Sequence, residues 1–236
     1  METCFEFKSL SKRFGNVQAL DEVNISIMPG RVIGLLGPNG SGKTTLIKLA
    51  NGLLTPSSGE ISVCGFKPGK ESKALVSYLP DRPCLPEWMN TRQLMDFYQD
   101  FYADFDRSRA EEMLSRLSIP DRRIIRQMSK GTREKVQLIM VMSRRAKLYL
   151  LDEPIGGVDP ATRDYILDTI IRNYDENASV VISTHLISDV ENALDEVIFL
   201  KEGHVNMQAS VDDIREQYGK SVDALFREVF KCLANL

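Results

Sequence analysis

Gly37-Pro38-Asn39-Gly40-Ser41-Gly42-Lys43-Thr44-Thr45 is the stretch that decides the fold of this chain. It fits the phosphate-loop pattern G-x4-G-K-[ST]. Residues 32–36 before it predict a buried strand, and residues 44–49 after it predict the start of a helix. This motif requires such a strand–loop–helix context. The glycines let the backbone turn its N–H groups inward as an anion nest, and the helix N-terminus adds partial positive charge. The whole run is therefore a candidate nucleotide-binding loop.

Two side chains of the loop carry specific expectations. Lys43 would reach the terminal phosphates of a nucleotide, and the Thr44 hydroxyl would hold Mg²⁺.

A second acidic segment supplies the carboxylate that such a metal site needs. Residues 148–151 predict a buried strand, and Asp152 follows at its end. Ligands of open parallel sheets lie outside the carboxyl ends of the strands, so Asp152 is expected to hold Mg²⁺ through water. Glu153 comes next and would polarise the attacking water as a general base. His185 follows another predicted strand, residues 180–184, and is expected to contact the γ-phosphate.

The composition favours a folded protein without a membrane span of its own. The chain has 236 residues, 43% of them hydrophobic, and no stretch approaches the roughly 18 apolar residues of a membrane-spanning helix. Residues 1–6 lack the basic and apolar regions of a signal peptide, so we expect the protein on the cytoplasmic side. The net charge of −3 argues against broad nucleic-acid binding.

The cysteines are Cys4, Cys64, Cys84 and Cys232, and no two of them have CxxC spacing. This pattern predicts reduced, buried thiols in a reducing compartment and no metal site.

The order of predicted elements indicates an α/β fold with a mainly parallel sheet. Strands alternate with helices except in a block that starts near Asp81, where apolar residues recur at helical spacing. The predicted strands lie at residues 5–36, 60–63, 74–79, 148–151, 179–183 and 196–200, and the predicted helices at 43–53, 129–145 and 160–173. An apolar stripe from Ile214 to Leu233 predicts one face of a helix. Packing on its own domain is the favoured interpretation of that stripe, and contact with a partner chain is the alternative.

The order of these motifs resembles the ATP-binding subunit of an ABC transporter, and the resemblance covers about residues 3–236. Its most specific element is Met128-Ser129-Lys130-Gly131-Thr132, which resembles the family signature Leu-Ser-Gly-Gly-Gln. Ser129 and Gly131 are retained, and the Ser-Lys-Gly form resembles cassettes of the drug, peptide and antibiotic exporter group. By itself, Ser-x-Gly is explained equally well by a Ser N-cap.

The resemblance implies further site residues. Phe14 matches the aromatic that stacks on adenine, where the family more often has Tyr, and residues 157–159 resemble the D-loop. His185 matches the switch histidine. Asp81 stands where the family usually has Gln, and it would still meet Mg²⁺ or its water. Residues 83–89 would either line a groove for a membrane subunit or pack inside the helical block.

The resemblance also implies an architecture. We expect a single domain over 1–236 with a P-loop NTPase core, an N-terminal antiparallel β-subdomain, an inserted α-helical subdomain at about 82–145, and C-terminal helices at about 211–236. Two cassettes, identical or paralogous, would pair head to tail around ATP and Mg²⁺. Integral membrane subunits would bind them at the inner face of the cell membrane.

Two other functions remain open at this point. The chain would be a soluble ABC-type ATPase acting on a ribosome or nucleic acid, although it lacks the fused cassettes, long insertion or basic tail of many of those. Alternatively, it would bind ATP and hardly hydrolyse it. Glu153 and His185 argue against that second alternative, and Asp81 leaves room for it. Within transport, the Ser-Lys-Gly signature and the absence of a substrate-binding module favour export.

Overall fold

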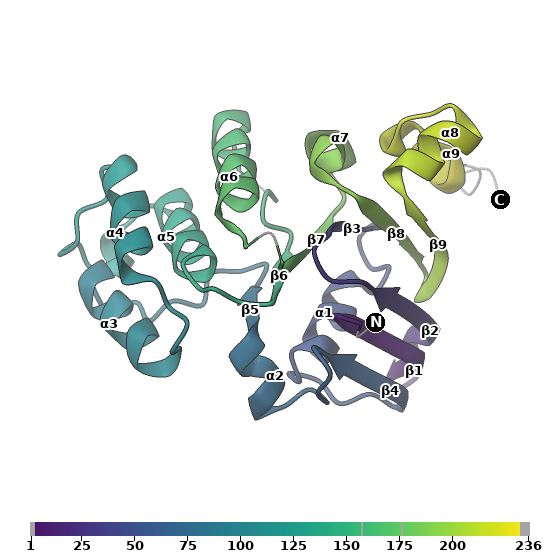
Figure 1. Ribbon diagram of the computed structural model, residues 1–236, viewed down its shortest axis with the longest axis horizontal. Helices are drawn as coiled ribbons and strands as arrows, with labels where there is room; N and C mark the ends of the chain where they lie inside the picture. The colour runs from purple at the N-terminus through teal and green to yellow at the C-terminus, as the bar shows by residue number, and fades with distance from the viewer. Residues whose placement is uncertain (1–2, 157, 176, 232–236) are drawn as a thin grey trace.

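The computed structural model describes residues 3–156, 158–175 and 177–231, whose strands form two sheets (Figure 1). The smaller sheet is antiparallel, with β1 between its neighbours in the order β2-β1-β4. Its strands are β1 (Phe5–Phe14), β2 (Val17–Ile27) and β4 (Ser58–Val63). Inward and outward side chains alternate along β2, as expected for a sheet with one buried face.

The larger sheet has the order β5-β6-β7-β3-β8-β9 and is parallel except for β9. Its strands are β5 (Val76–Leu79), β6 (Leu148–Asp152), β7 (Ser179–Thr184), β3 (Val32–Leu36), β8 (Glu196–Lys201) and β9 (His204–Ser210). All residues of β3, β6 and β7 are buried, which explains their continuous apolar sequences.

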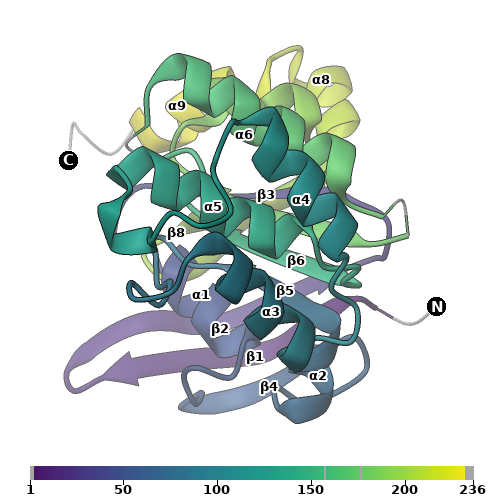
Figure 2. The same cartoon turned by 90° about the vertical axis from the view of Figure 1, so that its left-hand side faces the viewer.

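Helices cover the larger sheet and form a separate lobe at one end of the molecule. Figures 1 and 2 show α3, α4 and α5 grouped in this lobe, with α8 and α9 at the opposite end. The helices are α1 (Lys43–Ala50), α2 (Lys70–Leu75), α3 (Thr91–Phe101), α4 (Arg107–Arg116), α5 (Lys130–Met142), α6 (Pro160–Asn173), α7 (Ile187–Val190), α8 (Val211–Tyr218) and α9 (Val222–Lys231).

Polar residues define where several of these helices begin. The side chains of Asn90, Asp106, Ser129, Asp159 and Ser210 each accept a hydrogen bond from the backbone N–H three residues later. These N-caps satisfy donors that have no partner inside the helix. In α6, Pro160 occupies the first turn, where its missing N–H costs nothing.

The central strands separate two apolar cores. In β6, Leu148 and Leu150 join the core around α1, whereas Tyr149 and Leu151 join the core on the other face. Helix α1 lies between the two sheets, because it contacts β2 and β4 on one side and β6 on the other. The sheets thus hold α1 and the loop before it from both sides.

The fold class agrees with the sequence prediction, and three details of it differ. Helix α1 ends at Ala50, before the predicted boundary. Residues 74–79 are not a single strand, since α2 extends to Leu75 before β5 begins. Strand β9 was not predicted. The α/β architecture is confirmed, with a mainly parallel sheet, an antiparallel sheet near the N-terminus and an inserted helical block.

The apolar stripe of the C-terminal segment packs on its own domain, as favoured. It belongs to two helices, because Gly219 takes a left-handed conformation at φ 62° and ends α8. The ring of Phe226 in α9 lies 5.4 Å from that of Phe199 in β8. Tyr218 departs from the stripe and is exposed, and Leu233 lies outside the described residues.

The prediction of buried thiols is wrong for one cysteine. Cys4 is buried and Cys64 is half-buried, but Cys84 is exposed. Cys232 lies outside the described residues. Within the described chain, no helix is long and apolar enough to cross a membrane.

Candidate active site

A cleft of about 930 Å³ opens at the carboxyl edge of the larger sheet. Strands β6, β7 and β3 are consecutive and parallel, so the segments that follow them meet at this edge. The phosphate loop follows β3, the carboxylates of Asp152 and Glu153 come at the end of β6, and His185 follows β7. The register of the sheet thus brings three distant segments together.

The glycines of the phosphate loop are required by close neighbours. A Cβ at Gly37 would overlap the carbonyl oxygen of Leu200 in β8. Gly42 has φ 110°, and a Cβ there would lie 2.8 Å from the carbonyl oxygen of Ala19. The loop backbone therefore lies directly against β8 and β2, at distances that only glycine permits.

The turn between β8 and β9 supports the loop from outside. The backbone N–H of Gly203 donates to the carbonyl oxygen of Ser41 at 3.0 Å, and the Gly203 carbonyl accepts from Asp21 N at 2.9 Å. This turn was not assigned a role from sequence, because its contact with the loop depends on tertiary packing.

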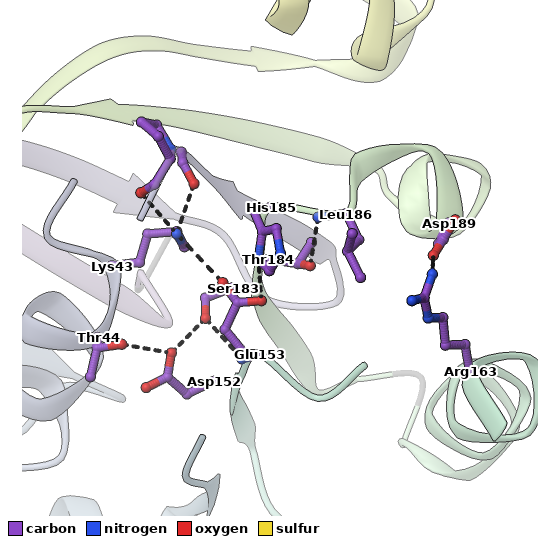
Figure 3. A network of polar contacts seen from close by, with 12 residues as sticks. Lys43, Thr44, Asp152, Glu153, Arg163, Ser183, Thr184, His185, Leu186 and Asp189 are labelled. Carbon is purple, nitrogen blue, oxygen red and sulfur yellow. Dashed lines mark hydrogen bonds and ion pairs between the residues drawn. The ribbon is translucent and has the colours of Figure 1, made fainter. Parts of the chain in front are cut away.

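Lys43 is folded back onto its own loop. Its Nζ donates to the carbonyl oxygens of Gly37 at 2.7 Å and Pro38 at 3.2 Å. It also lies 3.5 Å from Oε1 of Glu153, and only 6% of its side chain is exposed. The ammonium group is thus held at the floor of the cleft, where it is available to an anion (Figure 3).

Asp152 is buried with one of its oxygens unpartnered. Its Oδ1 accepts from Ser183 Oγ at 2.6 Å and from Thr44 Oγ1 at 3.1 Å. Its Oδ2 has no hydrogen-bond partner, although only 1% of the residue is exposed. Burial raises the pKa of Asp152 above its ordinary value, and the charges of Asp81 and Glu153 raise it further, while the two hydrogen bonds oppose the shift.

An unpaired buried carboxylate oxygen is costly, and here the other oxygen of the same carboxylate accepts from the Thr44 hydroxyl. Carboxylate and hydroxyl oxygens are the ligands that Mg²⁺ prefers. The Oγ of Ser41 in the phosphate loop is a second buried polar atom without a partner. The residues of this site therefore fit a divalent cation and a phosphate group.

Glu153 bridges the loop and the histidine. Its Oε1 faces Lys43, and its Oε2 lies 3.0 Å from Nδ1 of His185 (Figure 3). The backbone of Glu153 is left-handed at φ 49°, an uncommon conformation for a residue other than glycine. Its N–H donates to the carbonyl oxygen of Ser183 at 3.0 Å and to the Ser183 Oγ at 3.1 Å.

Ser183 is a site residue that the sequence did not predict. It is fully buried, and it holds both the Asp152 carboxylate and the Glu153 backbone. Its role comes from the pairing of β6 with β7, in which Asp152 lies opposite Ser183. No local pattern in the sequence encodes that pairing.

The other predicted residues lie at varying distances from this centre. Asp81 follows β5 and lines the cleft, as do Asn39, Gly40 and Thr45 of the loop. Phe14 does not line it. The Phe14 ring is 45% exposed at the end of β1, with Lys12 Nζ 4.9 Å from its centroid.

The start of α5 borders the cleft of its own chain, since Lys130, Arg133 and Glu134 line it. Ser129 is exposed and caps α5, with its Oγ 2.8 Å from the Thr132 hydroxyl. Neither Ser129 nor Gly131 lines the cleft, whereas Lys130 between them does. Of the predicted D-loop, Gly157 lies outside the described residues, and Asp159 caps α6.

A phosphate loop at the end of β3, with a buried aspartate and a neighbouring glutamate after β6, defines a P-loop nucleotide-binding ATPase. Comparison with known proteins narrows this class. The model of the ABC transporter family matches residues 20–156. The ABC transporter ATP-binding protein YtrB of Bacillus subtilis is 31% identical, over 91% of this chain and 75% of the relative.

Two other relatives carry more specific names. The daunorubicin resistance ATP-binding protein DrrA3 of Streptomyces coeruleorubidus is 29% identical over 96% of this chain and 75% of its own. The SkfA peptide export ATP-binding protein SkfE of Bacillus subtilis is 28% identical over 90% of this chain and 91% of its own length. A solved ATP-binding subunit of an ABC transporter superposes with a TM-score of 0.86 at 29% identity, covering 96% of this chain and 99% of that one.

This chain belongs to the ATP-binding domains of ABC transporters, and ATP hydrolysis is its activity. The resemblance read from the sequence is confirmed. The alternative of an ATPase acting on a ribosome or nucleic acid is not favoured, since the matching family is named for ABC transporters and these relatives are named for an ABC transporter, drug resistance and peptide export.

Proposed function

We propose that this chain closes head to tail with a second cassette around Mg²⁺-ATP, and that hydrolysis drives export through separate membrane subunits. The main support for this proposal is that the predicted site residues lie in two separate places on the chain. Lys43, Thr44, Asp152 and Glu153 gather around one cleft, while Ser129 is exposed on α5 and does not line it.

In the nucleotide half, the phosphate loop wraps the β- and γ-phosphates with its backbone N–H groups, and Lys43 moves from its carbonyl partners to the phosphate oxygens. Thr44 and Asp152 would hold Mg²⁺, whose charge, when bound, stabilises negative charge on the phosphates. Asp81 lines the same cleft and contributes a carboxylate to the metal or to its water. Phe14 does not line the cleft in the nucleotide-free protein, so the end of β1 that carries it would have to move for its ring to stack on the adenine.

Glu153 acts as the general base. Its carboxylate lies between Lys43 and His185 in the nucleotide-free protein. A bound γ-phosphate takes over the attraction of Lys43, which leaves Glu153 free to polarise the attacking water. His185 keeps its contact with Glu153 and senses the loss of the γ-phosphate.

The second half of the site comes from the other cassette. The N-terminus of α5 offers backbone N–H groups and the Ser129 hydroxyl, and such a helix end attracts phosphate. Gly131 carries no side chain, and a Cβ there would meet nothing within 4 Å, so the surface is open to an incoming nucleotide. In a closed dimer, Ser129 and Gly131 reach the γ-phosphate bound by the partner.

Membrane subunits and export are proposed from the relatives. DrrA3 is named for daunorubicin resistance and SkfE for peptide export. We infer a cargo that leaves the cell, a partner cassette that is a second copy or a paralogue, and a location at the inner face of the membrane.

The experiment is ATP turnover measured over a wide range of protein concentration. Since two chains complete each site, turnover per chain should rise with concentration and level off when dimers dominate. Lys43→Ala should stay inactive at every concentration, because the rise must come from this site. A flat turnover per chain, with the chains monomeric throughout, would contradict the shared site.

A further inference from the structure

Two cysteine thiols meet at one end of the smaller sheet, far along the chain from each other. Cys4 directly precedes β1, and Cys64 directly follows β4, strands that pair antiparallel with Phe5 opposite Val63. The N–H of Cys64 donates to the carbonyl oxygen of Cys4 at 2.7 Å, so the two residues continue the ladder. Their sulfur atoms are 4.0 Å apart.

A tight turn fixes the Cys64 side chain in this place. Val63 and Phe66 exchange backbone hydrogen bonds of 2.8 and 3.0 Å around Cys64 and Gly65. Both central residues have positive φ, 50° at Cys64 and 82° at Gly65, as in a type I′ hairpin turn. The thiol of Cys64 is thus held beside β1.

The backbone separation suits a disulfide. Residues directly opposite in antiparallel strands have Cα atoms about 4.5–5.5 Å apart, and disulfides join Cα atoms about 4.4–6.8 Å apart. Bond formation therefore needs rotation of two side chains and no movement of the strands.

The surroundings activate one of the two sulfurs. The pKa of Cys4 is lowered, chiefly by the hydrogen bond from the Cys64 thiol and then by the Ser179 hydroxyl and the charge of Lys147, against the effect of burial. The pKa of Cys64 is raised, because its proton is shared with Cys4 and because it is partly buried. Cys4 is only 5% exposed, whereas Cys64 is half-buried.

We propose that Cys4 and Cys64 are a redox modification site that forms a reversible disulfide with hydrogen peroxide as the oxidant. One sulfur, as the thiolate, attacks an oxygen of peroxide, the O–O bond breaks, and the released hydroxide takes up a proton to leave as water. The neighbouring sulfur then attacks the resulting sulfenic acid, the S–O bond breaks, and a second water leaves. Two thiols and one peroxide give one disulfide and two waters.

The location of the pair determines what the disulfide does. The closed loop from Cys4 to Cys64 contains the phosphate loop, α1 and all three strands of the smaller sheet. A cross-link over a loop of this length restricts the unfolded chain and stabilises the folded one. Neither cysteine lines the cleft, so nucleotide can still bind to the oxidised protein. Oxidation therefore stabilises the nucleotide-binding half against unfolding.

The test uses the full chain at neutral pH, treated with hydrogen peroxide, blocked with an alkylating reagent and digested with trypsin. The expected product joins the peptide that ends at Lys8 to the peptide that begins at Leu49, with the loss of two hydrogen atoms, and dithiothreitol reverses it. The melting temperature of the oxidised protein should rise by roughly 5–10 °C.

Cys64→Ser and, independently, Cys4→Ser should abolish both the linked peptide and the rise in melting temperature, and Cys84→Ser should leave both unchanged. The proposal fails if peroxide leaves the two peptides separate while oxidising Cys84. It also fails if the sulfurs of the pair are recovered as sulfinic acids, or if Cys64→Ser keeps the full shift in melting temperature.

Discussion

The carboxylate of Asp152 is buried, and its charge therefore lowers the free energy of unfolding of the nucleotide-free protein. Burial raises its pKa, so the folded state binds this proton more tightly than the unfolded chain does. The free energy of unfolding therefore decreases as pH rises from the ordinary aspartate range through the raised pKa of Asp152. At neutral pH the ionised carboxylate destabilises the fold, and cation binding would offset that cost.

Asp152→Asn should separate stability from activity. Without nucleotide at pH 7, the variant should melt at the same temperature as the natural protein or above it, by up to roughly 2–4 °C, the shift that about 1 kcal/mol produces at this size. At a pH well below the ordinary aspartate pKa the difference should vanish, since Asp152 is then protonated in both the folded and the unfolded state. ATP turnover should fall to background. Calorimetry at the two pH values checks this prediction, and a variant less stable at pH 7 would contradict it.

Ser183 links the carboxylate of Asp152, which would hold the metal, to the backbone of Glu153, the proposed general base. Ser183→Ala removes the hydrogen bonds to Asp152 Oδ1 and from Glu153 N. We expect the free energy of unfolding to decrease by about 1–3 kcal/mol, and kcat to fall about tenfold with little change in KM.

The matched control is Ser179→Ala, at the other end of the same strand. Ser179 is equally buried, and its hydroxyl donates to the carbonyl oxygen of Met28 at 3.2 Å. Its loss should lower stability and leave kcat unchanged. If both variants had the same kcat, Ser183 would be a purely structural residue.

At the scale of the elements, one buried arginine ties the helical lobe to the sheet. Arg144 follows α5, is 2% exposed, and pairs with Asp104 through two hydrogen bonds of 3.0 and 3.1 Å. The same guanidinium donates to the carbonyl oxygens of Ala74 in α2 and Val76 at the start of β5. It also stacks on Tyr102 at 3.8 Å from the ring centroid. Strand β5 leads directly to Asp81, so this tie joins the lobe to the cleft.

Asp104→Asn should destabilise the protein by about 3 kcal/mol, because it leaves the buried guanidinium without its counter-charge. Asp168→Asn in α6 is the matched control. It breaks an exposed i,i+4 pair with Arg172, which is worth less than about 0.5 kcal/mol. Urea unfolding of the two variants checks this prediction, and equal losses of stability would contradict it.

The sequence predicted elements with long periodic patterns and missed those without them. Strands β3, β6 and β7 each contain a run of apolar residues, and α6 begins at an Asp-Pro cap, so their positions follow from local chemistry. Helix α2 is short and polar, and β9 has an exposed face, so neither has a strong local signal. The apolar stripe from Ile214 to Leu233 predicts one helix face because it continues across Gly219, the residue that separates α8 from α9.

The candidate site divides in the same way. The phosphate loop, Asp152 and Glu153 are contiguous motifs beside buried strands, and a sequence pattern is enough to find them. Ser183, the β8–β9 turn and the bridge from Lys43 through Glu153 to His185 depend on which strands are neighbours. The sequence predicts β3, β6 and β7, but its local pattern does not show their order in the sheet.

At the scale of the whole molecule, we propose that the fold presents one half of a shared catalytic site at the cleft and the other half at the start of α5. The cleft lies over the carboxyl ends of the parallel strands, and the capped start of α5 belongs to the helical lobe. In the proposed dimer, each nucleotide joins the cleft of one chain to the lobe of the other. ATP therefore acts as the link between cassettes, and its hydrolysis lets them part.

The measurement that tests this account most directly is light scattering of Glu153→Gln with and without Mg²⁺-ATP. Without the proposed general base, ATP should persist in the cleft. We expect Glu153→Gln to be a dimer with ATP and a monomer with ADP or without nucleotide. Glu153→Gln combined with Ser129→Arg should remain monomeric, because the added side chain blocks the α5 surface. A Glu153→Gln protein that stays monomeric at saturating ATP would contradict the central claim.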